Sequence, residues 1–430
     1  MKRFGIILFL LAVSSMLPTM AQIEDLGLPK MSSRVRVYDG IVFAATSDGI
    51  YQLDALSSNG WQPFGFRGVD VRDFVMCDDI ITVLCDDGQA AAEGLKGIVG
   101  TRLLQSIDGG HSWVDITPIK METDDNLGTS SFYFELVQQP DDPKSIYYTV
   151  TTRRDPSASQ TTGMYHTLVG QSLDGGRSLT IKNVDGWDSF TLDFNRFSFD
   201  PTDKSHILMN SVNYATSTPS LSLTETTDCF STFIGGSIEE SLPDEAVSSA
   251  HHVDMLSDVV FLEHNDETSM IIGNSPSTGV ISLRRHPEHH FVWLYEVLNT
   301  DMRLQRLTTC PTDGNSLYGM SLSDDGRELQ LWRSADGMTW ERKAVRTLEM
   351  PAMSDWQIYE KDGSVYLYAD ASLFCYKTDG VTGIGTIESG IGGQTKRIYK
   401  VDGSTLSSMQ RRGLYIVREA DGSTRKVVVR

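Results

Sequence analysis

Short runs rich in Val, Ile, Leu, Tyr and Phe dominate the chain, and Gly, Asp and Asn separate them. The clearest are RVRVYDGIVFAAT (34–46), IITVLC (80–85), SIYYTVTT (145–152), HILMNSV (206–212) and VYLYADASLFCYK (365–377). Long helical periodicity is nearly absent. Runs of this composition bounded by turn residues are typical of β-strands. The pattern therefore predicts an all-β sandwich, barrel or propeller.

One turn pattern recurs between these runs. SIDGGHSW (106–113) returns as SLDGGRSL (172–179), as TTDCFSTF (226–233), which lacks the glycine pair, and as the shorter SADGMTW (334–340). The gap before the last copy is twice the gap before the third. A unit without a recognisable copy fits that gap, near GVISLRRHPEHHF (279–291).

A second repeat precedes these turns, with Pro, then Asp, then an apolar pair. It reads PDDPKSIY (140–147), PTDKSHIL (201–208) and PTDGNSLY (311–318), and HNDETSMI (264–271) keeps the Asp and the apolar pair. Pro presets φ and the Asp carboxylate accepts nearby N–H groups, so this motif is a turn that leads into a strand. Each unit then has four antiparallel strands, and its radial repetition predicts a β-propeller.

The repeats favour seven blades, and six or eight remain open because the first and last units are short and lack the Pro-Asp turn. The predicted blades begin near Arg34, Asp70, Ser131, Arg196, Val259, Leu304 and Trp356. The predicted boundaries are a signal peptide over 1–21, a propeller over 22–381, a Gly-rich linker over 382–395 and a small β module over 396–430.

The residues of the recurring turn have structural roles that require no substrate. In the first copy, Asp108 accepts hydrogen bonds from turn amides, Gly110 adopts positive φ, and Trp113 supplies buried area between sheets. We therefore interpret the positions that recur in these turns as structural. They are Ser106, Asp108, Gly110 and Trp113; Ser172, Asp174 and Gly176; and Ser334, Asp336 and Trp340.

These turns resemble the Asp-box of BNR-repeat proteins, S-x-D-x-G-x-(S/T)-(W/F), over about Val35 to Tyr376. The resemblance implies membership of a propeller superfamily that includes sialidases, other glycoside hydrolases, sortilin-like receptors and non-catalytic assembly factors. It also implies that the box lies on the outer hairpin of each blade. Because such folds serve many purposes, the resemblance fixes no reaction.

The two ends of the chain indicate export. MKRFGIILFLLAVSSMLPTMAQ has a basic start, an apolar stretch and small residues before a cleavage site after Ala21, as in a secretory signal peptide. The segment RRGLYIVREADGSTRKVVV resembles the C-terminal sorting segments of type IX secretion substrates. That resemblance implies a secreted or cell-surface protein that passes the periplasm of a Gram-negative bacterium, with this secretion machinery as a partner.

Charge and composition exclude several classes of function. The formal net charge is -20, whereas nucleic-acid binding needs clustered Lys and Arg, so we expect no nucleic-acid partner. No later segment is apolar enough to span a membrane. The five cysteines form no CxxC motif, and we expect buried thiols, no metal and no cofactor. Adjacent histidines on a strand would point to opposite faces, which disfavours a metal site at RRHPEHHF (284–291) and at His251-His252. We expect solvated loops there.

Catalysis stays open, and the sequence does not support it. The F-R-I-P motif of sialidases is absent: Arg34 and Arg36 have no matching context, and Tyr295-Glu296 and Tyr359-Glu360 are adjacent pairs that point to opposite faces of a strand. The alternative to a binding module is a glycoside hydrolase that uses carboxylates at the propeller axis. No catalytic residue is assigned.

The predicted ligand site lies on the rim where loops enter the innermost strands. Arg and aromatic residues anchor ligands and partners there. The candidates are Arg67, Arg72, Trp187, His251, Arg303 and Trp356, with His252 and Arg306 beside them. We expect non-catalytic binding of a glycan or a protein, and a third alternative is an assembly or receptor module that binds protein only. Ligand identity, oligomeric state and cleavage of the tail are not determined by the sequence.

Overall fold

The structure is a computed structural model of the chain, and it describes most of the sequence in separate stretches. The described residues are 23–28, 32–38, 41–53, 60–88, 98–117, 127–140, 142–154, 165–182, 196–213, 220–241, 247–252, 256–264, 268–275, 277–313, 315–349, 356–361, 363–369, 372–378, 397–400, 405–406, 413–418 and 424–429. The regular secondary structure in these stretches consists of β-strands and one short 3-10 turn.

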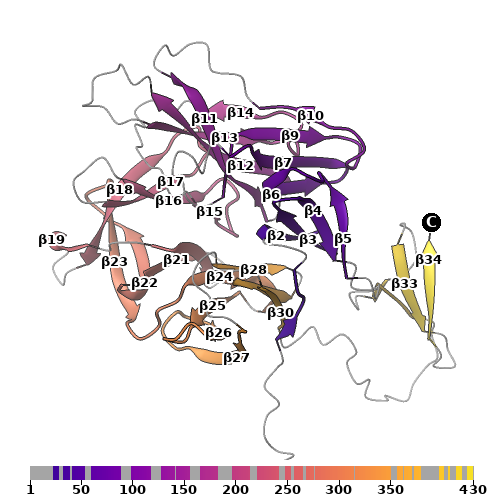
Figure 1. Ribbon diagram of the computed structural model, residues 1–430. Helices are drawn as coiled ribbons and strands as arrows, with labels where there is room; N and C mark the ends of the chain where they lie inside the picture. The colour runs from indigo at the N-terminus through magenta and orange to yellow at the C-terminus, as the bar shows by residue number, and fades with distance from the viewer. Residues whose placement is uncertain are drawn as a thin grey trace, which may run out of the picture.

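Seven antiparallel four-stranded units surround a central axis in the described part of the chain, which confirms the seven-bladed propeller (Figure 1). Blade 1 comprises β2 (Ser32–Tyr38), β3 (Ile41–Thr46), β4 (Gly49–Leu53) and β5 (Trp61–Gly65). Blade 2 comprises β6 (Asp70–Cys77), β7 (Ile80–Asp86), β9 (Arg102–Ser106) and β10 (Val114–Asp115). Blade 3 comprises β11 (Leu127–Gln139), β12 (Asp142–Arg154), β13 (Tyr165–Ser172) and β14 (Thr180–Lys182), and β8 (Val99–Gly100) pairs with β11.

The second half of the ring repeats this order. Blade 4 comprises β15 (Arg196–Phe199), β16 (Ile207–Asn213), β17 (Ser220–Thr226) and β18 (Ile234–Ser241), with β19 (Val247–His252) beside β18. Blade 5 comprises β20 (Asp258–His264), β21 (Thr268–Ser275), β22 (Gly279–Arg285) and β23 (Val292–Asn299). Blade 6 comprises β24 (Arg306–Cys310), the 3-10 turn η1 (Pro311–Asp313), β25 (Ser316–Leu322), β26 (Glu328–Ser334) and β27 (Glu341–Thr347).

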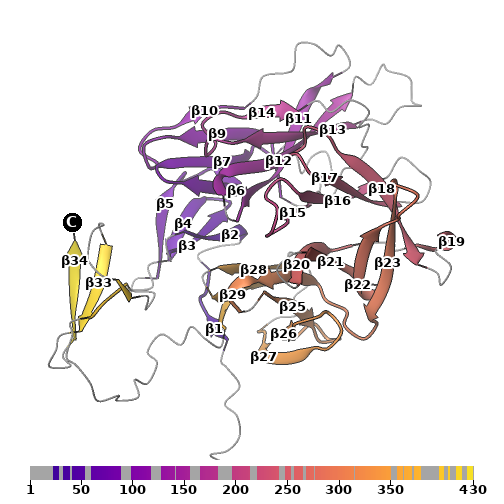
Figure 2. The same cartoon turned by 180° about the vertical axis from the view of Figure 1, so that it is seen from behind.

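The N-terminal strand completes the ring. Blade 7 comprises β28 (Trp356–Lys361), β29 (Ser364–Ala369) and β30 (Ser372–Lys377), and its outermost strand is β1 (Glu24–Asp25). Figure 2 shows indigo β1 beside the orange strands of this blade, where it pairs antiparallel with β30. Ile23, which precedes β1, is 2% exposed in the core between blades 6 and 7. The first and last units of the sequence are therefore short because the two ends of the propeller share one blade.

Apolar side chains fill the wedge between every two neighbouring blades. Blades 4 and 5, for example, are joined by a cluster that contains Leu208, Phe261 and Trp293, and comparable clusters occupy the other six junctions. A middle strand of a blade is thus buried on both faces, as β7 is along its whole length. This burial explains why IITVLC is a continuous apolar run rather than an alternating one.

One feature was not expected from the repeats. The outermost strands β18 and β23 pair in parallel, which joins blades 4 and 5 into one nine-stranded sheet. All five cysteines lie in the described residues and form no disulfide, and four of them are buried. The tail forms a sheet of its own from β31 (Arg397–Lys400), β32 (Thr405–Leu406), β33 (Gly413–Arg418) and β34 (Thr424–Val429), yellow in Figure 1.

Candidate functional site: charged clusters at the propeller axis

The box turns are closed by their own side chains. In the first copy, the Asp108 carboxylate accepts the backbone N–H groups of His111 at 3.0 Å and Ser112 at 2.9 Å. Ser106 Oγ accepts the N–H of Gly110 at 2.8 Å and donates to Asp108 Oδ1 at 2.7 Å. The hydroxyl and amide of Ser112, followed by the Ser106 hydroxyl, hold the pKa of Asp108 below its ordinary value. Every acceptor site of this carboxylate serves the turn.

The other turns with glycine repeat this arrangement at the outer hairpin between the third and fourth strands. The aspartate acceptors are Asp174 and Asp336, and the hydroxyls of Ser172 and Ser334 accept the N–H groups of Gly176 and Gly337. Trp113 and Trp340 donate their indole N–H to a carbonyl of their own turn, at 3.1 Å and 2.8 Å. The Trp113 ring lies 3.9 Å from the ring of Phe66 in blade 1. These side chains close the outer hairpins of their blades.

The copy without glycines keeps the same hydrogen bonds. Thr226 Oγ1 accepts the N–H of Phe230 at 2.9 Å, and Asp228 accepts the N–H of Thr232 at 2.7 Å. Cys229 and Phe230 take φ values of 54° and 62° where the other copies have glycine. Positive φ is costly for these residue types, so the turn geometry is retained against local strain.

The box-less turn of blade 5 uses a histidine for the same purpose. His286 Nδ1 accepts the backbone N–H groups of Glu288 and His289, each at 3.0 Å. His286 is 3% exposed, and its ring lies 4.5 Å from that of His289. The expectation of a solvated loop is therefore wrong for His286, because its imidazole replaces the capping carboxylate. The neighbouring Phe291 is exposed.

The predicted rim residues that the structure describes differ in exposure and in partners. Arg67 and Arg303 are exposed, and Trp356 is half-buried at the start of β28. Arg72 lies within β6, where its guanidinium meets Asp70 at 2.8 Å and Asp86 at 3.0 Å. Two carboxylates thus already pair with Nη2 of this guanidinium.

Three further predicted residues lie in a strand or outside the described residues. His251 and His252 belong to strand β19 rather than to a loop. Trp187 lies outside the described residues.

The innermost strands carry a set of charged side chains that the rim prediction missed. Four arginines and three carboxylates on these strands converge at the axis. They are Arg34 and Arg36 (β2), Asp73 (β6), Glu135 (β11), Arg196 (β15), Asp258 (β20) and Arg306 (β24). They form two clusters, which we name the Asp73 cluster (Arg34, Arg36, Asp73 and Glu135) and the Asp258 cluster (Arg196, Asp258 and Arg306).

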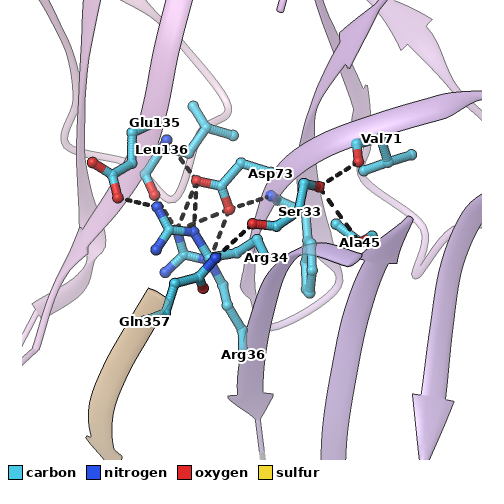
Figure 3. Close-up of polar contacts among 10 residues, drawn as sticks. Ser33, Arg34, Arg36, Ala45, Val71, Asp73, Glu135, Leu136 and Gln357 are labelled. Atoms are coloured by element: carbon cyan, nitrogen blue, oxygen red, sulfur yellow. Dashed lines mark hydrogen bonds and ion pairs between the residues drawn. The ribbon is translucent and has the colours of Figure 1, made fainter. Parts of the chain in front are cut away.

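The Asp73 cluster joins blades 1, 2 and 3 (Figure 3). Arg36 holds both oxygens of Asp73 with Nη2, each at 3.0 Å, and adds its Nε at 3.1 Å. The same carboxylate accepts the backbone N–H groups of Phe74 at 2.8 Å and Leu136 at 3.0 Å, and Arg34 Nε lies 3.5 Å away. Arg36 also donates to the carbonyl of Leu136. Asp73 has no exposed side-chain surface, and all its acceptor positions are used.

Electrostatics support full charge in this cluster. Burial disfavours the charged guanidinium of Arg36, but the Asp73 carboxylate raises its pKa above the ordinary value. Burial likewise opposes ionisation of Glu135, but Arg34 and then Arg196 lower the pKa of this carboxyl. Glu135 pairs with Arg34 and has φ of 36° at a bulge of β11. Bulges re-aim side chains, and here one turns Glu135 toward the arginines.

The Asp258 cluster joins blades 4, 5 and 6 with fewer contacts. Asp258 Oδ1 meets Arg196 Nη1 at 3.2 Å, and Oδ2 meets Arg306 Nε at 3.1 Å. Oδ2 also accepts the N–H of Leu307 at 2.8 Å. Burial raises the pKa of Asp258 to about 7, against the effects of Arg196 and the Leu307 amide and with a further contribution from the Glu135 carboxylate. Asp258 therefore changes its charge near neutral pH.

A cavity of ≈ 250 Å³ lies along the innermost strands of blades 3 to 6. Its charged lining is Glu135, Arg196 and Asp258, and Ser198, Thr308 and Thr309 add hydroxyl-bearing side chains. Phe197, Phe199 and Phe261 are the aromatic part of the wall. The Asp258 cluster thus borders a space large enough for a small polar group, while Asp73 and its arginines do not line it.

Metal-binding clusters and membrane-spanning helices are both absent from the described residues. No three or more His, Cys, Asp or Glu side chains gather there as a metal site. No helix in that part of the chain has the length and apolar character needed to cross a membrane.

The sequence held a signal for the axial site. Each of the first six innermost strands carries a charged residue within an apolar run, such as Asp73 in VRDFVM and Glu135 in SFYFELV. For Arg34 and Arg36 the sequence shows only that they do not match a sialidase motif. Their partners come from other blades, so only the closed ring shows what they do.

No protein-family model matches the chain, and none of the curated proteins matches it. Among solved structures, YCF48 from Cyanidioschyzon merolae is 13% identical over 83% of this chain and 99% of that one, with a TM-score of 0.45. PorZ, a surface component of the type-IX secretion system of Porphyromonas gingivalis, is 11% identical over 93% and 60%, with a TM-score of 0.47. A Trypanosoma rangeli sialidase in complex with sialic acid is 11% identical over 89% and 68%, with a TM-score of 0.41. These likenesses concern the fold, so function is argued from the site.

Proposed function

We propose that this protein is an exported, non-catalytic binding propeller that receives a small anionic group of a glycan or protein in the axial cavity. The observation that carries the proposal is the Arg196 guanidinium in the wall of that cavity. Arg196 shares the charged lining with Glu135 and Asp258, and its one ion pair among the described residues uses Nη1 alone. A guanidinium with further donors beside a partly buried cavity favours an anionic ligand group.

Arg196 is the residue best placed to contact such a group. Among the described residues its one ion pair is the contact of Nη1 with Asp258, so its other N–H groups have no protein partner there. Its side chain is 24% exposed and lines the cavity. A guanidinium with unused donors binds a carboxylate or sulfate through two parallel hydrogen bonds.

The size of the cavity limits what enters it. A volume of ≈ 250 Å³ is below the roughly 300–1,000 Å³ of pockets that enclose a drug-sized ligand. One sugar ring or one amino-acid side chain fits, and the remainder of the ligand lies on the rim. Exposed Arg67 and Arg303 and half-buried Trp356 are proposed as further contacts there.

A binding screen tests this function. Acidic glycans, neutral glycans and acidic peptides are titrated against the wild type and Arg196→Met. We expect acidic probes to bind the wild type and to lose at least about tenfold in affinity with Arg196→Met, which corresponds to roughly 1.4 kcal/mol. Equal binding of acidic and neutral probes would contradict an anion site at the axis.

One observation favours a second function, glycoside hydrolysis. Glu135 and Asp258 line the same cavity, and their pKa values are shifted in opposite directions. Such a divergence separates a carboxylate from a proton donor in acid-base catalysis. However, arginines hold both carboxyls, and Asp258 already accepts a backbone N–H. Turnover of aryl glycosides that is lost in both Glu135→Gln and Asp258→Asn would favour the hydrolase.

Export through the signal peptide and the tail is the remaining part of the proposal. The segment 396–430 holds nine Lys and Arg against three acids in a chain of net charge -20. We expect deletion from Lys396 to retain a folded propeller in the periplasm of a host with type IX secretion. Normal release of this truncated protein to the medium would show that the tail has no sorting role.

A further inference from the structure

The anion site of the Asp258 cluster is already filled by a carboxylate of the protein. Asp258 accepts an N–H group from Arg196 and the amide of Leu307, and it forms an ion pair with Arg306. These are the donors that a ligand carboxylate or sulfate would use at the same wall of the cavity. A ligand anion and the Asp258 carboxylate therefore compete for Arg196.

We propose that Asp258 is a built-in competitor for the ligand, so that the axial site binds anions more tightly when this carboxyl is protonated. This inference rests on the proposed function, because it concerns the regulation of the same cavity. The ligand class it implies carries an anion that stays charged below neutral pH, such as a sulfate ester or an acidic sugar.

The surroundings of Asp258 set the direction of the pH effect. Arg196 from β15 and Arg306 from β24 face it as cations, the Leu307 N–H donates to it, and Glu135 from β11 faces it as an anion. Burial is the largest influence and places its pKa at about 7. The protonated form prevails below pH 7 and removes the one carboxylate charge that contacts Arg196 among the described residues, while Glu135 continues to act on Arg196 without a direct contact. Affinity for an anion then rises as the pH falls through this range.

The Asp73 cluster shows why competition is confined to one half of the axis. Asp73 receives three contacts from Arg36 and two backbone N–H groups and has no exposed side-chain surface. A ligand that displaced it would leave a buried, unpaired carboxylate. Asp258 has fewer donors and borders open space, so its replacement by a ligand anion costs much less.

Calorimetric titration with sodium sulfate tests the proposal, because sulfate remains a dianion from pH 6 to pH 8. D-Glucuronate is the carboxylate probe and D-glucose the neutral control. If only the protonated state of Asp258 admits the anion, affinity at pH 6 exceeds that at pH 8 by about tenfold. The wild type also takes up protons on binding near pH 7.5, measured in buffers of different ionisation enthalpy, and this readout needs no variant.

Two variants separate competition from general electrostatics. Asp258→Asn keeps an acceptor for the Leu307 amide and removes the competing charge, so we expect flat pH dependence and affinity at pH 8 equal to or above that of the wild type at pH 6. Asp115→Asn is the matched control, since Asp115 pairs with Arg102 at 2.8 Å on the exposed outer edge of blade 2. It should keep the wild-type profile.

The outcomes distinguish this inference from the proposed function. Sulfate binding without pH dependence or proton uptake would overturn the competitor and leave the binding site in place. An unchanged profile in folded Asp258→Asn would do the same. Binding by Asp258→Asn but not by the wild type would support the competitor. Failure of both proteins to bind at pH 6 to 8 would overturn the proposed function and the inference together.

Discussion

The two axial clusters use the same residue types and reach opposite results. The Asp73 cluster has two arginines and two carboxylates, and its central carboxylate accepts every hydrogen bond it can. The Asp258 cluster has two arginines and one carboxylate, with 24% of the Arg196 side chain exposed to a cavity. The first cluster is a closed structural joint, in which the two arginines match two carboxylates. The second cluster has two arginines for one carboxylate.

Balance of donors and acceptors explains the difference. A buried ion pair offsets its desolvation only when additional hydrogen bonds satisfy both partners. The Asp73 cluster meets that condition through the amides of Phe74 and Leu136 from two blades. The Asp258 cluster meets it only in part, because the guanidinium of Arg196 uses one of its nitrogen atoms for Asp258 and has no other hydrogen bond among the described residues. Charge at a propeller axis is therefore no evidence for function until its hydrogen bonds are assigned.

The largest effect is expected in the closed cluster. Arg36→Met removes the guanidinium that holds Asp73 and leaves a fully buried carboxylate with fewer partners. Loss of one partner of such a pair costs about 3–5 kcal/mol. We expect the free energy of unfolding, measured by urea denaturation, to fall by this amount.

Arg36→Met also needs a control. Arg102→Met removes an exposed ion pair with Asp115 and is expected to cost at most about 1 kcal/mol. Similar losses for Arg36→Met and Arg102→Met would mean that the Asp73 cluster is not the closed joint described above.

A smaller stability change is expected in the open cluster. Arg196→Met leaves Asp258 with Arg306 and the Leu307 amide, and the carboxyl becomes protonated more readily. We expect a loss of at most about 1 kcal/mol in unfolding free energy, together with loss of acidic probes from the cavity. Unfolding as severe as that of Arg36→Met would show that the two clusters are equivalent joints and that the comparison fails.

The sequence predicted the fold because the propeller is built from local repeats. Box turns at Asp108, Asp174 and Asp336 and Pro-Asp turns between the first two strands are fixed by neighbours within a few residues. The box turn also docks on the turn between the first two strands of its blade: the amides of Gly109 and Gly175 donate to the carbonyls of Asp79 and Lys144 at 2.9 Å. Strand order and a preference for seven blades follow from such spacing.

The site could not be predicted in the same way, because its contacts join residues far apart in the chain. Arg36 meets Asp73 from the next blade, and Asp258 collects Arg196 and Arg306 from the blades on either side. Ring closure by β1 is equally non-local. The rim prediction chose residue types that anchor ligands, but it placed Arg72 in a loop, whereas β6 and two carboxylates hold it.

The smallest effect is expected from Tyr359→Phe, which tests whether the closed half of the axis is dry. Tyr359 stacks on Tyr366 at 5.1 Å, and its buried hydroxyl has no hydrogen-bond partner among the described residues. Burial, followed by Tyr366, raises its pKa well above the ordinary value although Arg36 opposes this. A desolvated hydroxyl without a partner contributes nothing favourable, so its removal should be neutral or stabilise by up to about 1 kcal/mol.

A matched tyrosine gives this last measurement its meaning. Tyr318 is also buried, and its hydroxyl donates to Asp313 at 2.7 Å, so Tyr318→Phe should cost about 1–3 kcal/mol. Thermal or urea unfolding of the two variants measures the difference at equal side-chain volume. A loss of about 1 kcal/mol in Tyr359→Phe as well would mean that water reaches the hydroxyl beside Arg36. The Asp73 cluster would then be hydrated, as the Asp258 cluster is at its cavity. The two clusters would differ in the degree of exposure and not in the balance of hydrogen-bond donors and acceptors.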